Sequence, residues 1–216
     1  MSSKAIKGWI DEDRRTLITK VGGKFKERGL DIKERLNTTV IRLKSQLDRL
    51  EFATDKIDKH DKKLFQKCVE AQVSKDRARA IMYANECAEL RRIMKTTLSC
   101  KLALEQVTLR LETVSKFNEI GALMSPVGSV VNSVKDQLSG IMPEVSYELG
   151  EIHQNLDSLA TDFGEVTEFS EPSSMGGEEA TSIIQEATAI AEQRIKDKFP
   201  DVPPQSQPEK RIPENY

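Results

Sequence analysis

The sequence predicts an all-α protein: a long antiparallel helical hairpin, then shorter helices and a proline-rich tail. No glycine or proline occurs between residues 30 and 120, and these two residues are the strongest helix breakers. Apolar residues make up only 38% of the 216 residues, aromatic residues 5% and charged residues 31%. So few apolar residues cannot fill a thick globular core, but they suit long helices that each bury one stripe.

The first arm of the hairpin is predicted from a near-heptad stripe, which indicates a helix of about 26 residues. The charged segment 58–63 interrupts the stripe, so a tight turn is expected there. A second helical pattern then runs from Leu64 to about residue 117, longer than the first by roughly 25 residues, and its far half needs another packing partner. The stripe consists of Ile32, Leu36, Val40, Leu43, Leu47, Leu50 and Ile57.

Residues 1–29 form a separate amphipathic segment in this prediction, because Gly22, Gly23 and Gly29 divide it from the hairpin core at 30–117. Residues 4–28 hold eight basic and four acidic side chains. One interpretation is an interfacial anchor that contacts an anionic membrane surface through Ile6, Trp9 and Ile10. The other is that the same apolar strip packs on the hairpin.

The C-terminal half is predicted to contain acidic regulatory helices at 118–170, a flexible linker at 171–178 and a terminal amphipathic helix at 179–198. The tail, 199–216, is rich in proline, which keeps the backbone extended. Its apolar side chains would then be free to enter a groove on a partner. The alternative is a plain disordered tail. The candidate contact residues are Phe199, Pro200, Val202 and Pro203.

Charge is divided along the chain. Residues 1–116 hold 27 Lys and Arg against 17 Asp and Glu, a net charge of +10, whereas residues 117–216 hold 6 against 18, a net of −12. A basic half can bind a polyanion such as an anionic membrane. The acidic half could fold back onto that basic surface, and such a closed state would be loosened by salt or by a partner.

No catalytic signature is found: the sequence has no phosphate-binding loop, no dinucleotide fingerprint, no nucleophile elbow and no metal-spaced set of ligands. We therefore expect no enzymatic activity, no cofactor and no metal. Cys68, Cys87 and Cys100 are expected to be reduced and buried in helices, and His60 and His153 to be solvated. The sequence has neither a membrane-spanning apolar run nor a signal peptide, which favours a cytoplasmic protein.

Taken together, this organisation resembles a subunit of the ESCRT-III family, specifically the archaeal cell-division, CdvB-type members. The resemblance covers residues 10–203. Its most specific part is the tail sequence Phe199-Pro200-Asp201-Val202-Pro203, which is similar to the family's Leu-Pro-x-Val-Pro motif, with Phe199 in place of leucine. In the family this motif binds the MIT domain of an AAA-type ATPase that remodels the polymer.

The resemblance implies a homo- or hetero-polymer that assembles on the inner face of the cell membrane at the division site and remodels or severs the membrane. The long basic hairpin agrees with this, since head-to-tail contacts between identical copies give open filaments. A soluble coiled-coil scaffold without membrane activity is the main alternative. A nucleic-acid-binding role is disfavoured, because the basic residues alternate with acids and the aromatic residues are too few for base stacking.

Overall fold

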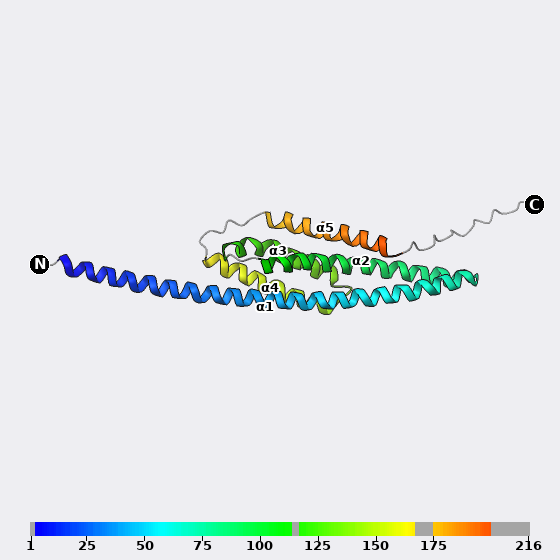
Figure 1. Cartoon of the computed structure of the whole chain (residues 1–216), viewed down its shortest axis with the longest axis horizontal. Helices are drawn as coiled ribbons and strands as arrows, with labels where there is room; N and C mark the ends of the chain where they lie inside the picture. Colours follow the sequence, from blue (N-terminus) through cyan, green and yellow to red (C-terminus); the bar gives the residue numbers. More distant parts are fainter. Residues whose placement is uncertain (1–2, 114–116, 167–174, 200–216) are drawn as a thin grey trace, which may run out of the picture. The chain divides into compact units, whose positions relative to one another are not determined.

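The computed structural model describes the backbone of residues 3–113, 117–166 and 175–199, and the side chains of residues 31–113, 123–162 and 177–199. Within these ranges there are five helices and no strand, so the all-α prediction is confirmed (Figure 1). The chain divides into two compact units: Met1–Leu47 with Ala103–Ile183, and Asp48–Leu102 with Ile184–Tyr216. The helices are α1 (Ser3–Val73), α2 (Arg77–Thr113), α3 (Phe117–Leu138), α4 (Pro143–Val166) and α5 (Met175–Lys198).

The turn between α1 and α2 lies at residues 74–76, and the turn predicted at 58–63 is wrong. The amide of Asp76 donates to the carbonyl of Ala71 at 2.9 Å, and the amide of Lys75 to that of Gln72 at 3.0 Å. This is a Schellman motif, which requires a left-handed residue after the helix, and Lys75 takes that role with φ of 59°. Asp76 then caps α2 by accepting a hydrogen bond from the amide of Arg79 at 3.2 Å.

The charged segment 58–63 continues the helix because two of its acids are inside the protein. Asp58 and Asp61 are buried and paired with basic side chains, so these positions extend the buried stripe instead of interrupting it. As a result α1 has 71 residues and α2 has 37. The expectation that the second helix outruns the first is therefore wrong. The glycines between residues 22 and 29 do not end α1 either, since it begins at Ser3.

In the first unit the buried stripe of α1 is largely as predicted. Its side chains at Ile32, Leu36, Val40 and Leu43 are buried, while Leu47 is half-buried. The end of α2 contributes a further buried apolar set, which consists of Ala103, Leu104, Val107 and Leu111.

The rest of the first unit's core comes from α3 and α4, which pack against each other. Pro143 is the first residue of α4, a position where the missing amide has no helical partner to lose. Ser146 ties the two helices together, since its hydroxyl donates to the carbonyl of Lys135 at 2.9 Å. The buried side chains are Val127, Val130, Val131, Val134 and Leu138 of α3, and Val145, Leu149, Ile152, Leu156 and Leu159 of α4.

In the second unit the antiparallel arms of α1 and α2 approach through small side chains. Ala71, Ala80 and Ala84 are buried. Cys68 lies among them, and its thiol contacts the carbonyl of Ala80 at 3.4 Å. Larger side chains fill the seam further from the turn, namely Leu50, Met94 and Leu98.

Several buried polar groups are hydroxyls that are satisfied within their own helix. Thr39 donates to the carbonyl of Arg35 at 2.9 Å, Thr97 to that of Ile93 at 3.0 Å and Thr108 to that of Leu104 at 2.7 Å. Each is less than a tenth exposed. The helix faces therefore carry polar side chains at little desolvation penalty.

All three cysteines are free and buried, as predicted. Burial raises the pKa of Cys87 to about 11 and that of Cys100 to about 12, so both thiols stay protonated near neutral pH. His60 is exposed as expected, but His153 is only half-exposed, with Nε2 at 3.4 Å from Asp157. Over the residues that the structure describes, none of the helices combines the length and apolarity needed to cross a membrane.

Candidate functional site: ion-paired contacts of α4 and α5

In the first unit α4 lies on the basic face of α1. Arg35 and Arg42 are two helical turns apart and therefore project on the same side of α1. Arg35 pairs with Asp162 and donates to the hydroxyl of Ser158 at 2.9 Å, while Arg42 pairs with Glu148 at 3.1 Å. The contact between an acidic C-terminal helix and the basic hairpin, predicted from the charge division, is thus present.

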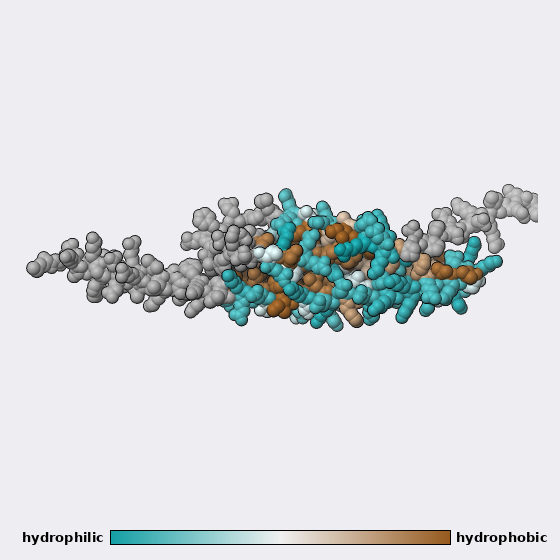
Figure 2. Space-filling model, viewed as in Figure 1, coloured by the Kyte–Doolittle hydropathy of each residue, from teal (hydrophilic) through white to brown (hydrophobic). Residues whose placement is uncertain are grey.

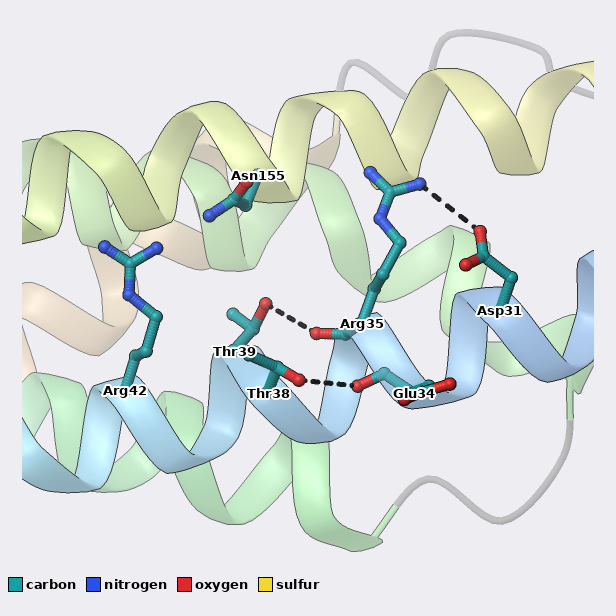
Figure 3. A pocket seen from close by; sticks show the side chains of 7 residues that line it. All are labelled: Asp31, Glu34, Arg35, Thr38, Thr39, Arg42 and Asn155. Atoms are coloured by element: carbon teal, nitrogen blue, oxygen red, sulfur yellow. Dashed lines mark hydrogen bonds and ion pairs between the residues drawn. The ribbon is translucent and has the colours of Figure 1, made fainter.

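A polar cavity of about 330 Å³ lies between these two ion pairs. Figure 3 shows Arg35 and Arg42 directed from α1 toward α4, with Asn155 of α4 between them. Both guanidinium groups are already paired with carboxylates. The arrangement is therefore a charge-paired contact between helices and contains no nucleophile–base pair. The remaining lining residues are Asp31, Glu34, Thr38 and Thr39.

The ion pairs in the first unit hold their helices weakly. The side chains of the Arg35 and Arg42 pairs are between about one-third and somewhat under half exposed, and so are those of the pair between Arg110 and Glu179 at the start of α5. Pairs this exposed are worth about 0.2–1 kcal/mol each and are screened by salt. Such contacts can direct α4 and α5 to the hairpin without making their binding permanent.

The second unit holds the end of α5 in a more buried way. Asp61 of α1 is 2% exposed and accepts two hydrogen bonds from the guanidinium of Arg91, at 2.9 and 3.1 Å. The same guanidinium lies 5.6 Å from the ring centre of Phe65 and 5.1 Å from that of Phe199. Both distances are within the range of a cation–π interaction. Arg91 thus links the hairpin to the residue that follows α5.

Further contacts fix the direction of α5 in this unit. Thr188 hydrogen-bonds Ser99 at 2.9 Å, Glu192 pairs with Lys95, and Phe199 reaches Arg91. From the start of these contacts to the end of α5, the residue numbers of the partners on α2 decrease from 99 to 91. The helix α5 therefore runs antiparallel to α2, toward the turn at residues 74–76.

Lys198 adds an ion pair at the end of α5. Its ammonium lies 3.2 Å from Asp58, which also pairs with Lys62 at 2.9 Å. Burial raises the pKa of the Asp58 carboxyl, but its contacts with the two lysines outweigh burial, and the net pKa lies below the ordinary value of 3.8. The pair is therefore charged at neutral pH.

The predicted site residues are only partly covered by the described side chains. Phe199 is 8% exposed, so the expectation that it stands free for a partner is wrong in this conformation. Its neighbours Pro200, Val202 and Pro203 lie outside the described residues. Ile6, Trp9 and Ile10 are in α1, but their side chains also lie outside the described set.

The division of charge predicted that an acidic helix contacts the basic hairpin in the first unit, but it did not identify the ion pairs of Arg35 and Arg42. The contacts of Arg91 with Asp61 and Phe199 were not predicted. Asp58 and Asp61 had been interpreted as part of a solvated turn. A signal was available: Asp61 follows Ile57 by four residues and precedes Leu64 by three, which is the spacing of a buried stripe.

No protein-family model and no solved structure matches the chain. Curated proteins do match, among them two of Sulfolobus acidocaldarius. Cell division protein B1 is 45% identical over 172 residues, which is 80% of each chain. Cell division protein B is 31% identical over 188 residues, covering 87% of this chain and 72% of that protein. The chain therefore belongs to the archaeal cell division protein B family, the CdvB-type ESCRT-III subunits.

Proposed function

We propose that this chain is a non-enzymatic subunit of a filament that acts in archaeal cell division, where it assembles on the inner face of the cell membrane and remodels it. The family supports the cell-division role, since the two relatives described above are named as cell division proteins. In this proposal the conformation described here is the closed one. Opening exposes the basic face of α1 to the membrane and to neighbouring copies.

The observation that carries the proposal is the pairing of Arg35 with Asp162 and of Arg42 with Glu148. The acidic helix occupies basic side chains that would otherwise face an anionic surface. Two such pairs contribute about 0.4–2 kcal/mol together, which corresponds to a factor of roughly 2 to 30 in the population of an open state. The closed state is therefore easy to release.

The test removes the two acids and keeps the chain whole. A double variant, Glu148→Gln with Asp162→Asn, should bind anionic vesicles and assemble at lower protein concentration than the natural chain. A matched control, Glu144→Gln with Asp157→Asn, removes two α4 charges that form no ion pair with the described side chains of α1; Asp157 lies instead 3.4 Å from His153. Co-sedimentation and electron microscopy give the readout. Equal behaviour of the two double variants would refute the closed-state role of α4.

The membrane contact in this proposal is the N-terminal strip at Ile6, Trp9 and Ile10. Replacing all three by serine should reduce vesicle binding without changing the helical signal in circular dichroism. One strip inserts only a few apolar side chains and gives weak attachment, so an array of copies is needed for firm binding. Undiminished vesicle binding by the triple variant would assign the strip to packing on the hairpin.

The tail in this proposal recruits the MIT domain of an AAA-type ATPase, which recycles the filament. A peptide of residues 194–208 should bind that domain with affinity on the order of micromolar, and Val202→Asp should abolish binding while leaving assembly intact. Calorimetry at millimolar peptide decides the matter: absence of heat with the natural peptide removes the motif assignment.

A further inference from the structure

The hairpin of the second unit carries an apolar surface that α5 leaves uncovered. Val69, Val73 and Ile81 are 44%, 79% and 42% exposed. Figure 2 shows apolar side chains at this end of the hairpin. Half of the large apolar side chains that are exposed in the described part of the chain fall between residues 69 and 82. Clustered apolar side chains on a surface indicate a contact with another segment or molecule.

These three residues continue the side of the hairpin that already contacts α5. Phe65, Val69 and Val73 are spaced by four residues and lie near one stripe of α1. On α2, Ile81 is five helical turns from Ser99, the partner of Thr188, and therefore has the same angular position. We call Val69, Val73 and Ile81 the apolar extension of the α5 contact.

We propose that the apolar extension is the docking surface of the chain's own tail, residues 200–204, with Val202 seated beside Val69 and Val73. Three observations support this occupant: the end point of α5, the direction in which it runs, and the reach of the segment that follows. The proposal deepens the function proposed above, because Phe199 and Val202 are also the residues expected to bind the ATPase.

The end point and direction come from contacts already described. Phe199 lies against Arg91, and the same guanidinium also lies over the ring of Phe65, at the edge of the apolar extension. Since α5 runs antiparallel to α2, the chain leaves Phe199 toward Val69 on one arm and toward Ile81 on the other. The amide of Phe199 still donates to the carbonyl of Ile195 at 3.0 Å, which fixes the exit direction along α5.

The reach of the tail fits the length of the surface. Ile81 lies ten residues from Arg91 along α2, a rise of about 15 Å. Proline-rich sequence advances about 3.1 Å per residue in an extended left-handed helix, so five residues, 200–204, span the same distance. Val202 would lie about 9 Å beyond Phe199. Along α1, Val69 and Val73 are about 6 and 12 Å beyond Phe65. The position expected for Val202 therefore lies between these two valines.

The side-chain period of the tail fits as well. An extended proline helix has three residues per turn, so residues three apart point the same way. Phe199 faces the hairpin, and Val202 therefore faces it too. The two residues of the tail motif would then be covered together, and a partner that binds them must first displace them from the hairpin.

The first experiment is a disulfide trap in the full chain. With copper phenanthroline and dissolved oxygen as the oxidant at pH 8, Val202→Cys with Val69→Cys should close an intramolecular disulfide at least tenfold faster than Val202→Cys with Glu70→Cys. Glu70 is the exposed neighbour, 100° further round α1. The three native thiols are buried, which keeps them out of the reaction. Equal rates for the two pairs, or a disulfide between two chains, would overturn the proposal.

The second experiment measures access to the tail without a trap. In a chain that carries Val202→Cys, adding Ile81→Asp should speed alkylation of the introduced thiol by a maleimide several-fold, whereas the matched change Met82→Asp should leave the rate unchanged. Ile81 and Met82 are similarly exposed, but only Ile81 lies in line with the α5 contact. Equal rates in all three chains would mean that the surface serves a second copy or a lipid surface instead.

Neither experiment includes the ATPase, so the two proposals fail separately. Trapping without binding of the 194–208 peptide to the MIT domain would remove only the recruitment role. Peptide binding without trapping would remove only the docking of the tail on the hairpin.

Discussion

Removing the ring of Phe199 should loosen the end of α5 while leaving the rest of the protein unchanged. Phe199 is nearly fully buried and lies against the Arg91 guanidinium. Burying a phenylalanine side chain is worth about 1.5–3 kcal/mol, and the cation–π contact adds about 0.5–1 kcal/mol. Phe199→Ala should therefore cost about 2–4 kcal/mol at this contact, which is roughly a 30- to 900-fold change in the opening equilibrium.

Native-state hydrogen exchange in the full chain measures this opening residue by residue. Amides of α5 near its end should exchange at least tenfold faster in Phe199→Ala, with those of α3 and α4 unaffected. Phe199→Leu should have a smaller effect, since it keeps an apolar side chain and loses only the cation–π contact. Phe52→Ala is the control, because the same truncation at an exposed phenylalanine removes no packing. If Phe199→Ala exchanged like Phe52→Ala, the anchoring role of Phe199 would be refuted.

Four other substitutions test the packing and the turns. Leu43→Asp should lower the free energy of unfolding by about 3–5 kcal/mol, because it places a carboxylate at a fully buried position; an unchanged melting temperature would contradict the buried stripe. Gly128→Ala should raise the free energy of unfolding by about 0.5–1 kcal/mol, because the new methyl meets only ordinary contacts in a helix interior. Urea titration measures this, and a lower free energy of unfolding would contradict that geometry. Lys75→Gly should raise the free energy of unfolding by about 1 kcal/mol, because glycine adopts a positive φ without strain. Calorimetry measures this, and an unchanged free energy of unfolding would mean that Lys75 is not strained in this turn. Because folding lowers the pKa of Asp58, its ion pair with Lys198 stabilises the fold fully above the ordinary pKa of 3.8. This stabilisation is lost as the pH falls through the folded-state pKa. Amide hydrogen exchange at the end of α5 should therefore increase with acid more in the natural chain than in Asp58→Asn.

The sequence predicted the helices better than it predicted their ends. Apolar periodicity identified the buried stripe at Ile32–Leu43 and the presence of helices within 118–170, because a period near 3.6 is visible without knowledge of partners. The α1–α2 turn was misplaced because its signal is absent: the left-handed position is filled by Lys75 rather than by glycine or asparagine. Charge at 58–63 suggested solvent, whereas Asp61 is buried against a basic residue thirty positions away.

The candidate site was predictable at the level of segments and not of side chains. A basic hairpin and an acidic helix must attract each other, so the division of charge was sufficient to expect their contact. The pairing of each arginine with a particular carboxylate depends on how α4 is rotated about its own axis relative to α1. That rotation is determined by the packing of many apolar side chains. The burial of Phe199 was unpredictable for the same reason, since Arg91 is one of many basic residues.

The self-bonded hydroxyls of the helices have a consequence for motion. A threonine that donates to a carbonyl four residues earlier in its own helix, as Thr39 and Thr97 do, needs nothing from the helix packed on it. When the covering helix departs or shifts by a turn, these two threonines keep their acceptors, so their hydrogen bonds add nothing to the barrier. Thr39 and Thr97 therefore impose no register on the helix that covers them, unlike the interhelical bond between Ser99 and Thr188.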